Sequence, residues 1–148
     1  MSRIKGLDHI AVAVRDLEEA LKIWQEKLGL ILEKVEEVES EGIKVAHLRT
    51  PEGFTIELMT PLVSGSSLEK FLAQKGEGLH HLCFEVEDID QWEEDLTSRG
   101  ISFLPGYPKA GSRQTIIAFV HPRSMTGVLV EFAQPREVNK VTLTVIKG

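Results

Sequence analysis

The sequence is poor in cysteine and in long apolar runs, and it has no excess of basic charge. A single cysteine, Cys83, excludes a disulfide within the chain and is typical of a protein from a reducing compartment. No apolar run approaches the roughly 20 residues that cross a membrane, and the first residues lack the apolar stretch of a signal peptide. We therefore expect a cytoplasmic protein with no membrane partner.

The charge balance is acidic, with 23 Asp and Glu residues against 17 Lys and Arg residues. Nucleic-acid binding requires a basic face, so we expect no nucleic-acid partner. Binding of an anionic small ligand remains possible, because the local electrostatic potential of a site matters more for binding than the net charge of the chain. At 148 residues and 42% hydrophobic content, the chain is long enough for one ordinary domain or two small fused modules.

An internal repeat organises the chain. His81 follows His9 by 72 residues, and each histidine stands at the head of an alternating strand pattern. Each is followed seven residues later by an aspartate, Asp16 or Asp88, that is suited to cap a helix. Such a repeat indicates two copies of one supersecondary unit.

The apolar periodicity predicts the order β-α-β-β-β in both copies. The first copy has expected strands at 7–14, 30–39, 43–49 and 54–59 and a helix at 16–28; the second has expected strands at 79–86, 101–104, 114–120 and 127–133 and a helix at 88–99. We predict an α+β fold of two tandem βαβββ modules that form a shared cleft. The expected divisions are module one at 1–62, a linker helix at 63–77, module two at 78–134 and an extension at 135–148. Residues 141–146 are a candidate for an extra edge strand.

Four of these strands place bulky apolar residues on one face and an ionisable residue on the other. The ionisable residues are His9, Glu57, His81 and Glu131. Each alone has an ordinary explanation, a histidine at a strand end or a glutamate on the solvent face of a sheet. Their recurrence at matched places predicts one shared metal site. Imidazole and carboxylate ligands suit divalent Co, Ni, Zn, Mn or Fe, and the lack of a thiolate cluster argues against a closed structural zinc site.

Several strings of the sequence resemble the vicinal oxygen chelate superfamily and, within it, the methylmalonyl-CoA epimerase family. They are Leu7-Asp8-His9-Ile10, Ile56-Glu57-Leu58-Met59-Thr60-Pro61, Gly76-Glu77-Gly78-Leu79-His80-His81, Phe119-Val120-His121-Pro122-Arg123-Ser124 and Gly127-Val128-Leu129-Val130-Glu131. The resemblance covers about residues 5–134. It implies a divalent metal, Co²⁺ first with Zn²⁺, Ni²⁺ and Mn²⁺ as alternatives, an acyl-CoA thioester substrate and a homodimer. The implied reaction is epimerisation at C2 of methylmalonyl-CoA through a metal-stabilised enolate.

The same resemblance implies roles for individual residues. It assigns His9, Glu57, His81 and Glu131 as metal ligands, with Glu131 also a candidate proton carrier. A second carrier is a glutamate in part of the family, but the matching position here is Val45, which cannot transfer a proton. His47, on the same strand face, is the candidate replacement, with a packed histidine at the cleft rim as the alternative. His80 is expected on the opposite strand face and not among the ligands.

Lys109 and Arg113 lie on a Pro/Gly-rich loop that is expected to border the cleft. They are candidates for contact with the substrate carboxylate or a CoA phosphate, and surface solubility is the alternative.

Other members of the superfamily remain possible. Lactoylglutathione lyase (glyoxalase I) uses the same type of ligand set, ring-cleaving dioxygenases use two His and one Glu, and metal-free members bind drugs without catalysis. The linker helix and the Gly-Glu-Gly-Leu-His-His string favour the epimerase.

Overall fold

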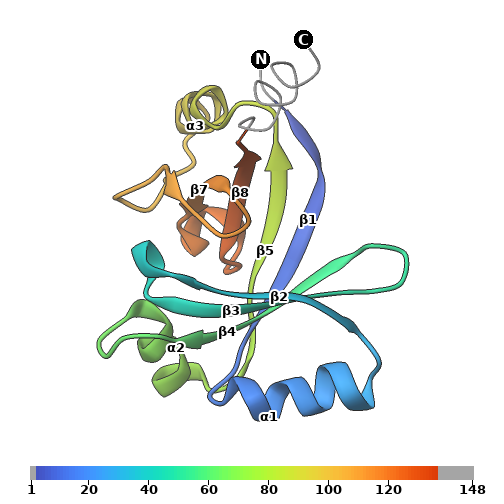
Figure 1. Ribbon diagram of the computed structural model, residues 1–148. Helices are drawn as coiled ribbons and strands as arrows, with labels where there is room; N and C mark the ends of the chain where they lie inside the picture. Colours follow the sequence, from blue (N-terminus) through green and yellow to red (C-terminus); the bar gives the residue numbers. More distant parts are fainter. Residues whose placement is uncertain (1–2, 137–148) are drawn as a thin grey trace.

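The computed structural model describes residues 3–136 (Figure 1). The candidate strand at 141–146 lies outside the described residues. The first half comprises β1 (Ile4–Ala13), α1 (Leu17–Leu21), the π-helical turn η1 (Lys22–Lys27), β2 (Ile31–Val38), the short turn η2 (Glu39–Glu41), β3 (Ile43–Arg49) and β4 (Thr55–Pro61). After α2 (Ser67–Lys75), the second half comprises β5 (Gly78–Val86), α3 (Ile89–Ser98), β6 (Lys109–Ala110), β7 (Thr115–Val120), η3 (Pro122–Met125) and β8 (Val130–Pro135). None of the helices in residues 3–136 is long and apolar enough to cross a membrane.

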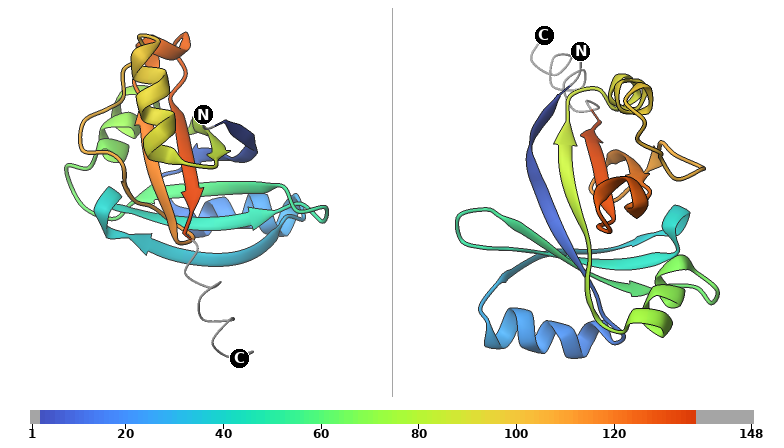
Figure 2. Two further views of the ribbon diagram at one scale, coloured as in Figure 1. Left: turned by 90° about the horizontal axis from the view of Figure 1, so that it is seen from above. Right: turned by 180° about the vertical axis from the view of Figure 1, so that it is seen from behind.

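The strands form one mixed sheet of eight strands in the order β2-β3-β4-β1-β5-β8-β7-β6. Each half pairs its first and last strands in parallel, β1 with β4 and β5 with β8. The two halves join edge to edge through the antiparallel pair β1–β5. The sheet curls strongly, so that β2–β4 and β6–β8 approach one another on its inner side (Figures 1 and 2). The two predicted βαβββ modules are therefore confirmed, and they share one continuous sheet.

Each half carries one helix on the outer face of the sheet (Figure 2). Under α1, Leu17 packs with Val12, Leu48 and Leu58 in one apolar cluster. Under α3, Trp92 and Leu96 pack in a second apolar cluster, which also contains Val120, Val130 and Phe132. These are the apolar strand faces that the period of two places under the helices. The ionisable residues are left for the inner, concave side.

The predicted helix caps are confirmed. Asp16 accepts a hydrogen bond from the backbone N–H of Glu19, and Asp88 accepts one from Gln91, each at 3.1 Å. The first helix changes to π geometry after Leu21, where the N–H of Leu28 bonds to the carbonyl of Ile23 at 2.8 Å. No residue of this turn is fully buried, although Trp24 packs against the cluster under α1.

The second half differs from the prediction in two places. The expected strand at 101–104 is only an isolated bridge between Phe103 and Val120, because the Pro105-Gly106 turn, with Gly106 at a φ of 88°, diverts the chain. The loop expected at 105–112 instead contains β6, which pairs with β7.

Candidate metal centre

The structure brings the four predicted ligands to one place: His9, His81 and Glu131 offer donor atoms within 4.8 Å of one another, and Glu57 contacts His9. They project from the four central strands β1, β4, β5 and β8, and their exposed fractions lie between 3 and 6%. His9 Nε2 lies 3.2 Å from His81 Nε2, 3.2 Å from Glu131 Oε1 and 3.3 Å from Glu57 Oε1. His81 Nε2 lies 3.1 Å from Glu131 Oε1.

This arrangement fits a divalent cation. Ligand bonds of about 2.1 Å at right angles separate neighbouring donor atoms by about 3 Å, which matches these distances. Glu57 Oε2 is buried and has no hydrogen-bond partner among the described residues. Burying two carboxylates is costly unless positive charge accompanies them. Two imidazoles and two carboxylates are also a donor set that borderline divalent ions accept.

Without a cation, protons carry the positive charge in this cluster. Burial opposes protonation of His9, but the carboxylates of Glu57, Asp8 and Glu131 outweigh it and raise the pKa of His9 to about 10. Burial likewise opposes ionisation of Glu131, yet His81 and His9 hold its pKa well below the usual range. The centre is thus built to hold anionic carboxylates beside a positive charge.

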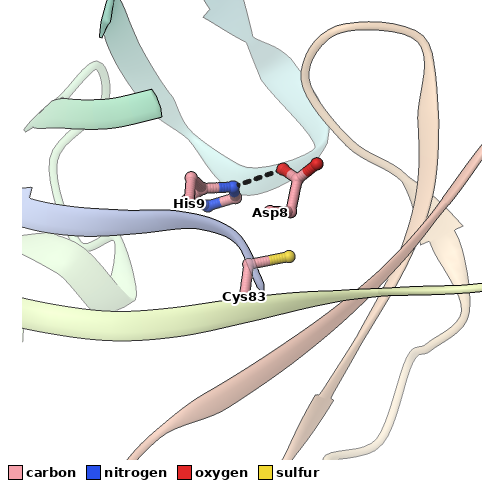
Figure 3. A group of neighbouring side chains, drawn as sticks. All are labelled: Asp8, His9 and Cys83. Carbon is pink, nitrogen blue, oxygen red and sulfur yellow. Dashed lines mark hydrogen bonds and ion pairs between the residues drawn. The ribbon is translucent and has the colours of Figure 1, made fainter. Parts of the chain in front are cut away.

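Two residues contact the ligand histidines without belonging to the four predicted ligands, and we call them outer partners. The first is Asp8, which the sequence analysis did not single out. Asp8 Oδ2 lies 2.7 Å from His9 Nδ1 (Figure 3) and also pairs with the guanidinium of Arg113. Although burial raises it, the pKa of Asp8 is lowered overall by His9 and Arg113. A carboxylate at Nδ1 favours the proton there and leaves the Nε2 lone pair for a metal.

The second outer partner is His80, whose Nδ1 lies 2.8 Å from His81 Nδ1. The prediction that His80 lies on the opposite strand face is wrong. The register of β1 and β5 slips so that Val12 pairs with Leu79 while Ala11 pairs with His81, which leaves His80 in a β-bulge. Burial, assisted by His81, lowers the pKa of His80 to about 3, so its imidazole is neutral.

The two outer partners occupy equivalent places. The register also slips between Leu7 and His9, which places Asp8 in a bulge of β1 just as His80 is in a bulge of β5. In both halves, the residue before the ligand histidine turns back and reaches that histidine's Nδ1. A polar residue precedes each ligand histidine in the sequence, which is a signal for such a partner. A strict period of two, however, predicts that the side chain of this residue lies on the opposite face of the strand.

A cavity of about 400 Å³ opens on the centre. Glu57, His81 and Glu131 line it together with His80. Its other walls are largely apolar, and residues that line them include Met59, Phe71, Leu104, Ile117, Phe119 and Leu129. Lys70 and Lys75 of α2 supply positive charge to the lining.

The rim of the cavity joins the two halves of the chain. Tyr107 Oη donates to the Glu41 carboxylate at 2.8 and 3.1 Å, and burial together with this contact raises the pKa of Tyr107. Lys109 Nζ lies 2.7 Å from Glu41 Oε2. These contacts link η2 of the first half to β6 and the loop before it in the second.

Lys109 and Arg113, the predicted substrate contacts, do not line this cavity. Lys109 pairs with Glu41, and Arg113 pairs with Asp8 and lines a second, polar cavity with Asp8, Thr55 and Glu85. Their contact with substrate stays a prediction.

His47 and Val45 lie on β3, in register with Glu57 and Met59 of β4. His47 is 1% exposed; its Nε2 lies 2.8 Å from Glu36 and its Nδ1 faces Glu57 Oε2 at 3.3 Å, out of line for a hydrogen bond. Val45 is buried in an apolar cluster with Met59 and Leu68. His47 does not line the cavity, and it contacts the lining residue Glu57.

Cys83 is a buried neighbour of the centre. Asp8, His9 and Cys83 offer donor atoms within 4.8 Å of one another (Figure 3). Burial raises the pKa of the Cys83 thiol, so it stays protonated and is a poor metal ligand.

Comparison with known proteins gives a consistent result. The sequence profile of the glyoxalase/bleomycin resistance protein/dioxygenase superfamily matches residues 8–119. The ethylmalonyl-CoA/methylmalonyl-CoA epimerase of Cereibacter sphaeroides is 36% identical over 133 residues, which are 88% of this chain and 98% of that protein.

Two solved structures are similar along nearly their whole length. The methylmalonyl-CoA epimerase from Mycobacterium tuberculosis matches with a TM-score of 0.87 and 34% identity, covering 93% of each chain. A variant of Streptomyces coelicolor methylmalonyl-CoA epimerase in complex with 2-nitronate-propionyl-CoA matches with a TM-score of 0.83 and 30% identity, covering 90% of this chain and 99% of that one.

Proposed function

Because this chain belongs to the glyoxalase/bleomycin resistance protein/dioxygenase superfamily, we propose that it is a metal-dependent epimerase that interconverts (R)- and (S)-methylmalonyl-CoA. The observation that carries the proposal is the buried cluster of His9, Glu57, His81 and Glu131 at the wall of a cavity of about 400 Å³. Relatives and structural neighbours that are named as methylmalonyl-CoA epimerases support the same activity.

An acyl-CoA thioester suits the cavity. Its apolar walls accommodate an alkyl group, and Lys70 and Lys75 offer positive charge to the phosphates of CoA. The relative from C. sphaeroides is named for ethylmalonyl-CoA as well as methylmalonyl-CoA, which supports tolerance of a longer 2-alkyl group.

His9, Glu57, His81 and Glu131 would hold the cation, with Co²⁺ the first choice and Zn²⁺, Ni²⁺ or Mn²⁺ as alternatives. When bound, a divalent ion supplies the positive charge that stabilises the enolate formed on loss of the C2 proton. Glu131 lines the cavity, so its carboxylate is placed to accept a proton at C2. His47 remains the predicted carrier for the opposite face, acting by way of Glu57.

Assembly and location are part of the proposal. A homodimer is supported by the resemblance to the epimerase family and by the exposed apolar residues Ile4, Leu7 and Leu79 on the two strands that join the modules. A cytoplasmic location is supported by the low cysteine content, since Cys83 is the one cysteine of the sequence and is free and buried.

Proton exchange at C2 tests the function. Methylmalonyl-CoA is incubated in D₂O with the protein and Co²⁺, with and without a chelator, and deuterium at C2 is followed by NMR. We expect exchange only with metal, and a loss of at least a hundredfold in Glu131→Gln, which keeps the size of the side chain but removes a basic carboxylate. Absence of exchange together with turnover of the methylglyoxal–glutathione adduct would instead identify a lactoylglutathione lyase.

A further inference from the structure

We propose that His80 has two roles at once: it accepts the Nδ1 proton of the metal ligand His81, and it donates its own Nε2 proton to the bound thioester substrate. The substrate role rests on the proposed function, whereas the role toward His81 requires only the metal site. His80 would therefore be a contact residue that links the substrate to the metal centre.

The tautomers follow from the geometry. His81 Nε2 faces the other ligand atoms, at 3.1 Å from Glu131 Oε1 and 3.2 Å from His9 Nε2. To offer a lone pair from Nε2, neutral His81 must carry its proton on Nδ1. The 2.8 Å contact then requires His80 Nδ1 to accept that proton, so His80 carries its own on Nε2.

The Nε2–H of His80 is available to a ligand. His80 lines the large cavity, and Nδ1 is occupied by His81, so Nε2 is the polar atom it can present there. No hydrogen-bond partner of this Nε2 occurs within residues 3–136. The ring is also held in place, because Phe71 packs edge-on against it with 4.7 Å between ring centroids.

The surrounding charges favour a neutral donor at this point. Glu57 and Glu131 line the same cavity, so a substrate oxygen that approaches the centre meets carboxylates on the protein side. An N–H donor partly offsets that repulsion without adding a charge that would compete with the metal.

The matching residue of the other half cannot have this role. Asp8 orients His9 from a different side, pairs with Arg113 and lines the second, polar cavity. Of the two outer partners, only His80 lines the large cavity. The two halves of the repeat have thus diverged: the first has an ionic partner in the polar cavity, and the second has a neutral partner in the large cavity.

Two variants separate the two roles. The amide of asparagine occupies the place of histidine Nδ1, so His80→Asn keeps an acceptor for His81 and loses the donor. The amide of glutamine reaches the place of Nε2, so His80→Gln keeps the donor and loses the acceptor. Co²⁺ affinity is measured by visible absorption on the metal-free protein, and methylmalonyl-CoA affinity by calorimetry on the Co²⁺-saturated protein. His121→Asn, a histidine substitution outside the cavity, is the matched control.

We expect His80→Gln to weaken Co²⁺ binding by at least tenfold, as removal of an outer partner of a metal ligand does, while His80→Asn stays within about threefold of the wild type. We expect His80→Asn to weaken methylmalonyl-CoA binding by about fivefold, the value of one neutral hydrogen bond, with His80→Gln much less affected. Unchanged Co²⁺ affinity in His80→Gln would overturn the role toward His81, and unchanged thioester affinity in His80→Asn would overturn the donor role. A wild-type protein that binds Co²⁺ but not methylmalonyl-CoA would overturn the proposed substrate and the donor role, and the Co²⁺ titrations would still decide the role toward His81.

Discussion

His9 Nε2 and His81 Nε2 lie 3.2 Å apart, although the two histidines belong to different halves of the chain. Glu57 accompanies the first and Glu131 the second, so each half supplies one imidazole and one carboxylate. A cation bound to all four would tie the two modules together at the centre of the sheet. Metal binding should therefore appear in the stability of the whole domain.

The first prediction concerns metal and thermal stability. A ligand present at 100 times its Kd stabilises the folded state by about 2.7 kcal/mol, which for a domain of this size is about 8 °C in Tm. We expect Co²⁺ to raise Tm by about this amount and a chelator to reverse it, measured by circular dichroism. His81→Ala, which removes a ligand, should lose most of the shift. A full shift in that variant would show that the ion binds elsewhere.

The second prediction concerns the proton on His9. Because the pKa of His9 is raised from 6.5 to about 10 in the folded, metal-free protein, His9 is protonated at pH 7, and a cation must displace that proton. Binding should release about one proton per ion, and the apparent affinity should rise about tenfold per pH unit between pH 7 and 9. Calorimetry in buffers of different ionisation enthalpy measures the release. Binding without proton release at pH 7 would contradict the raised pKa.

The raised pKa of His9 also makes the stability of the metal-free protein depend on pH. A folded-state pKa above the unfolded value means that protonated His9 stabilises the fold fully below about pH 6.5. This contribution is lost as pH rises from there through about 10. The metal-free protein should accordingly unfold at lower denaturant concentration at pH 9 than at pH 7.

The third prediction concerns Asp8. Asp8→Asn keeps the size of the side chain but removes the negative charge at His9 Nδ1 and the ion pair with Arg113. We expect Co²⁺ affinity to fall by about 10- to 100-fold, measured by absorption titration. Glu85→Gln is the control, since Glu85 lines the same polar cavity and pairs with Lys5 at 3.3 Å. Equal losses in both variants would indicate a general charge effect instead of orientation of His9.

The sequence predicted those features of the molecule that follow from the regular alternation of side-chain direction in helices and strands. The capping aspartates, the apolar faces under the helices and the inward side of His9, Glu57, His81 and Glu131 all follow from periods of 3.6 and 2.0 residues. Their recurrence at matched places predicted one shared metal site, and the family resemblance assigned all four residues as its ligands.

The sequence did not predict the features that break those periods. His80 was placed on the wrong face because a β-bulge inserts one residue, and a bulge is decided by pairing with a distant strand. Arg113 reaches Asp8 from a left-handed backbone conformation at a φ of 51°, which residues other than glycine rarely adopt. Its backbone N–H donates to Glu36 at 2.9 Å, a contact between halves that no local pattern reveals.

The last prediction concerns His47 as the carrier of the second proton. Glu36 accepts from the backbone of Arg113 and lies 2.8 Å from His47 Nε2. Burial opposes ionisation of Glu36, but these two contacts lower its pKa overall, so it provides a fixed anionic partner for the imidazole. His47 Nδ1 faces Glu57, which lines the cavity. A proton that leaves or returns on this side would pass by way of Glu57, whereas Glu131 serves the other face.

Exchange from each epimer, measured separately, tests this assignment. If two carriers serve opposite faces, His47→Gln should slow deuterium exchange from one epimer of methylmalonyl-CoA about 100-fold more than from the other, and Glu131→Gln should show the reverse preference. Weaker metal binding would slow both epimers alike, so the ratio of the two rates isolates proton transfer from any effect on Glu57. His121→Gln is the matched control and should leave the ratio unchanged. An equal loss for both epimers in His47→Gln would show that His47 only supports Glu57 and that the second proton has another carrier.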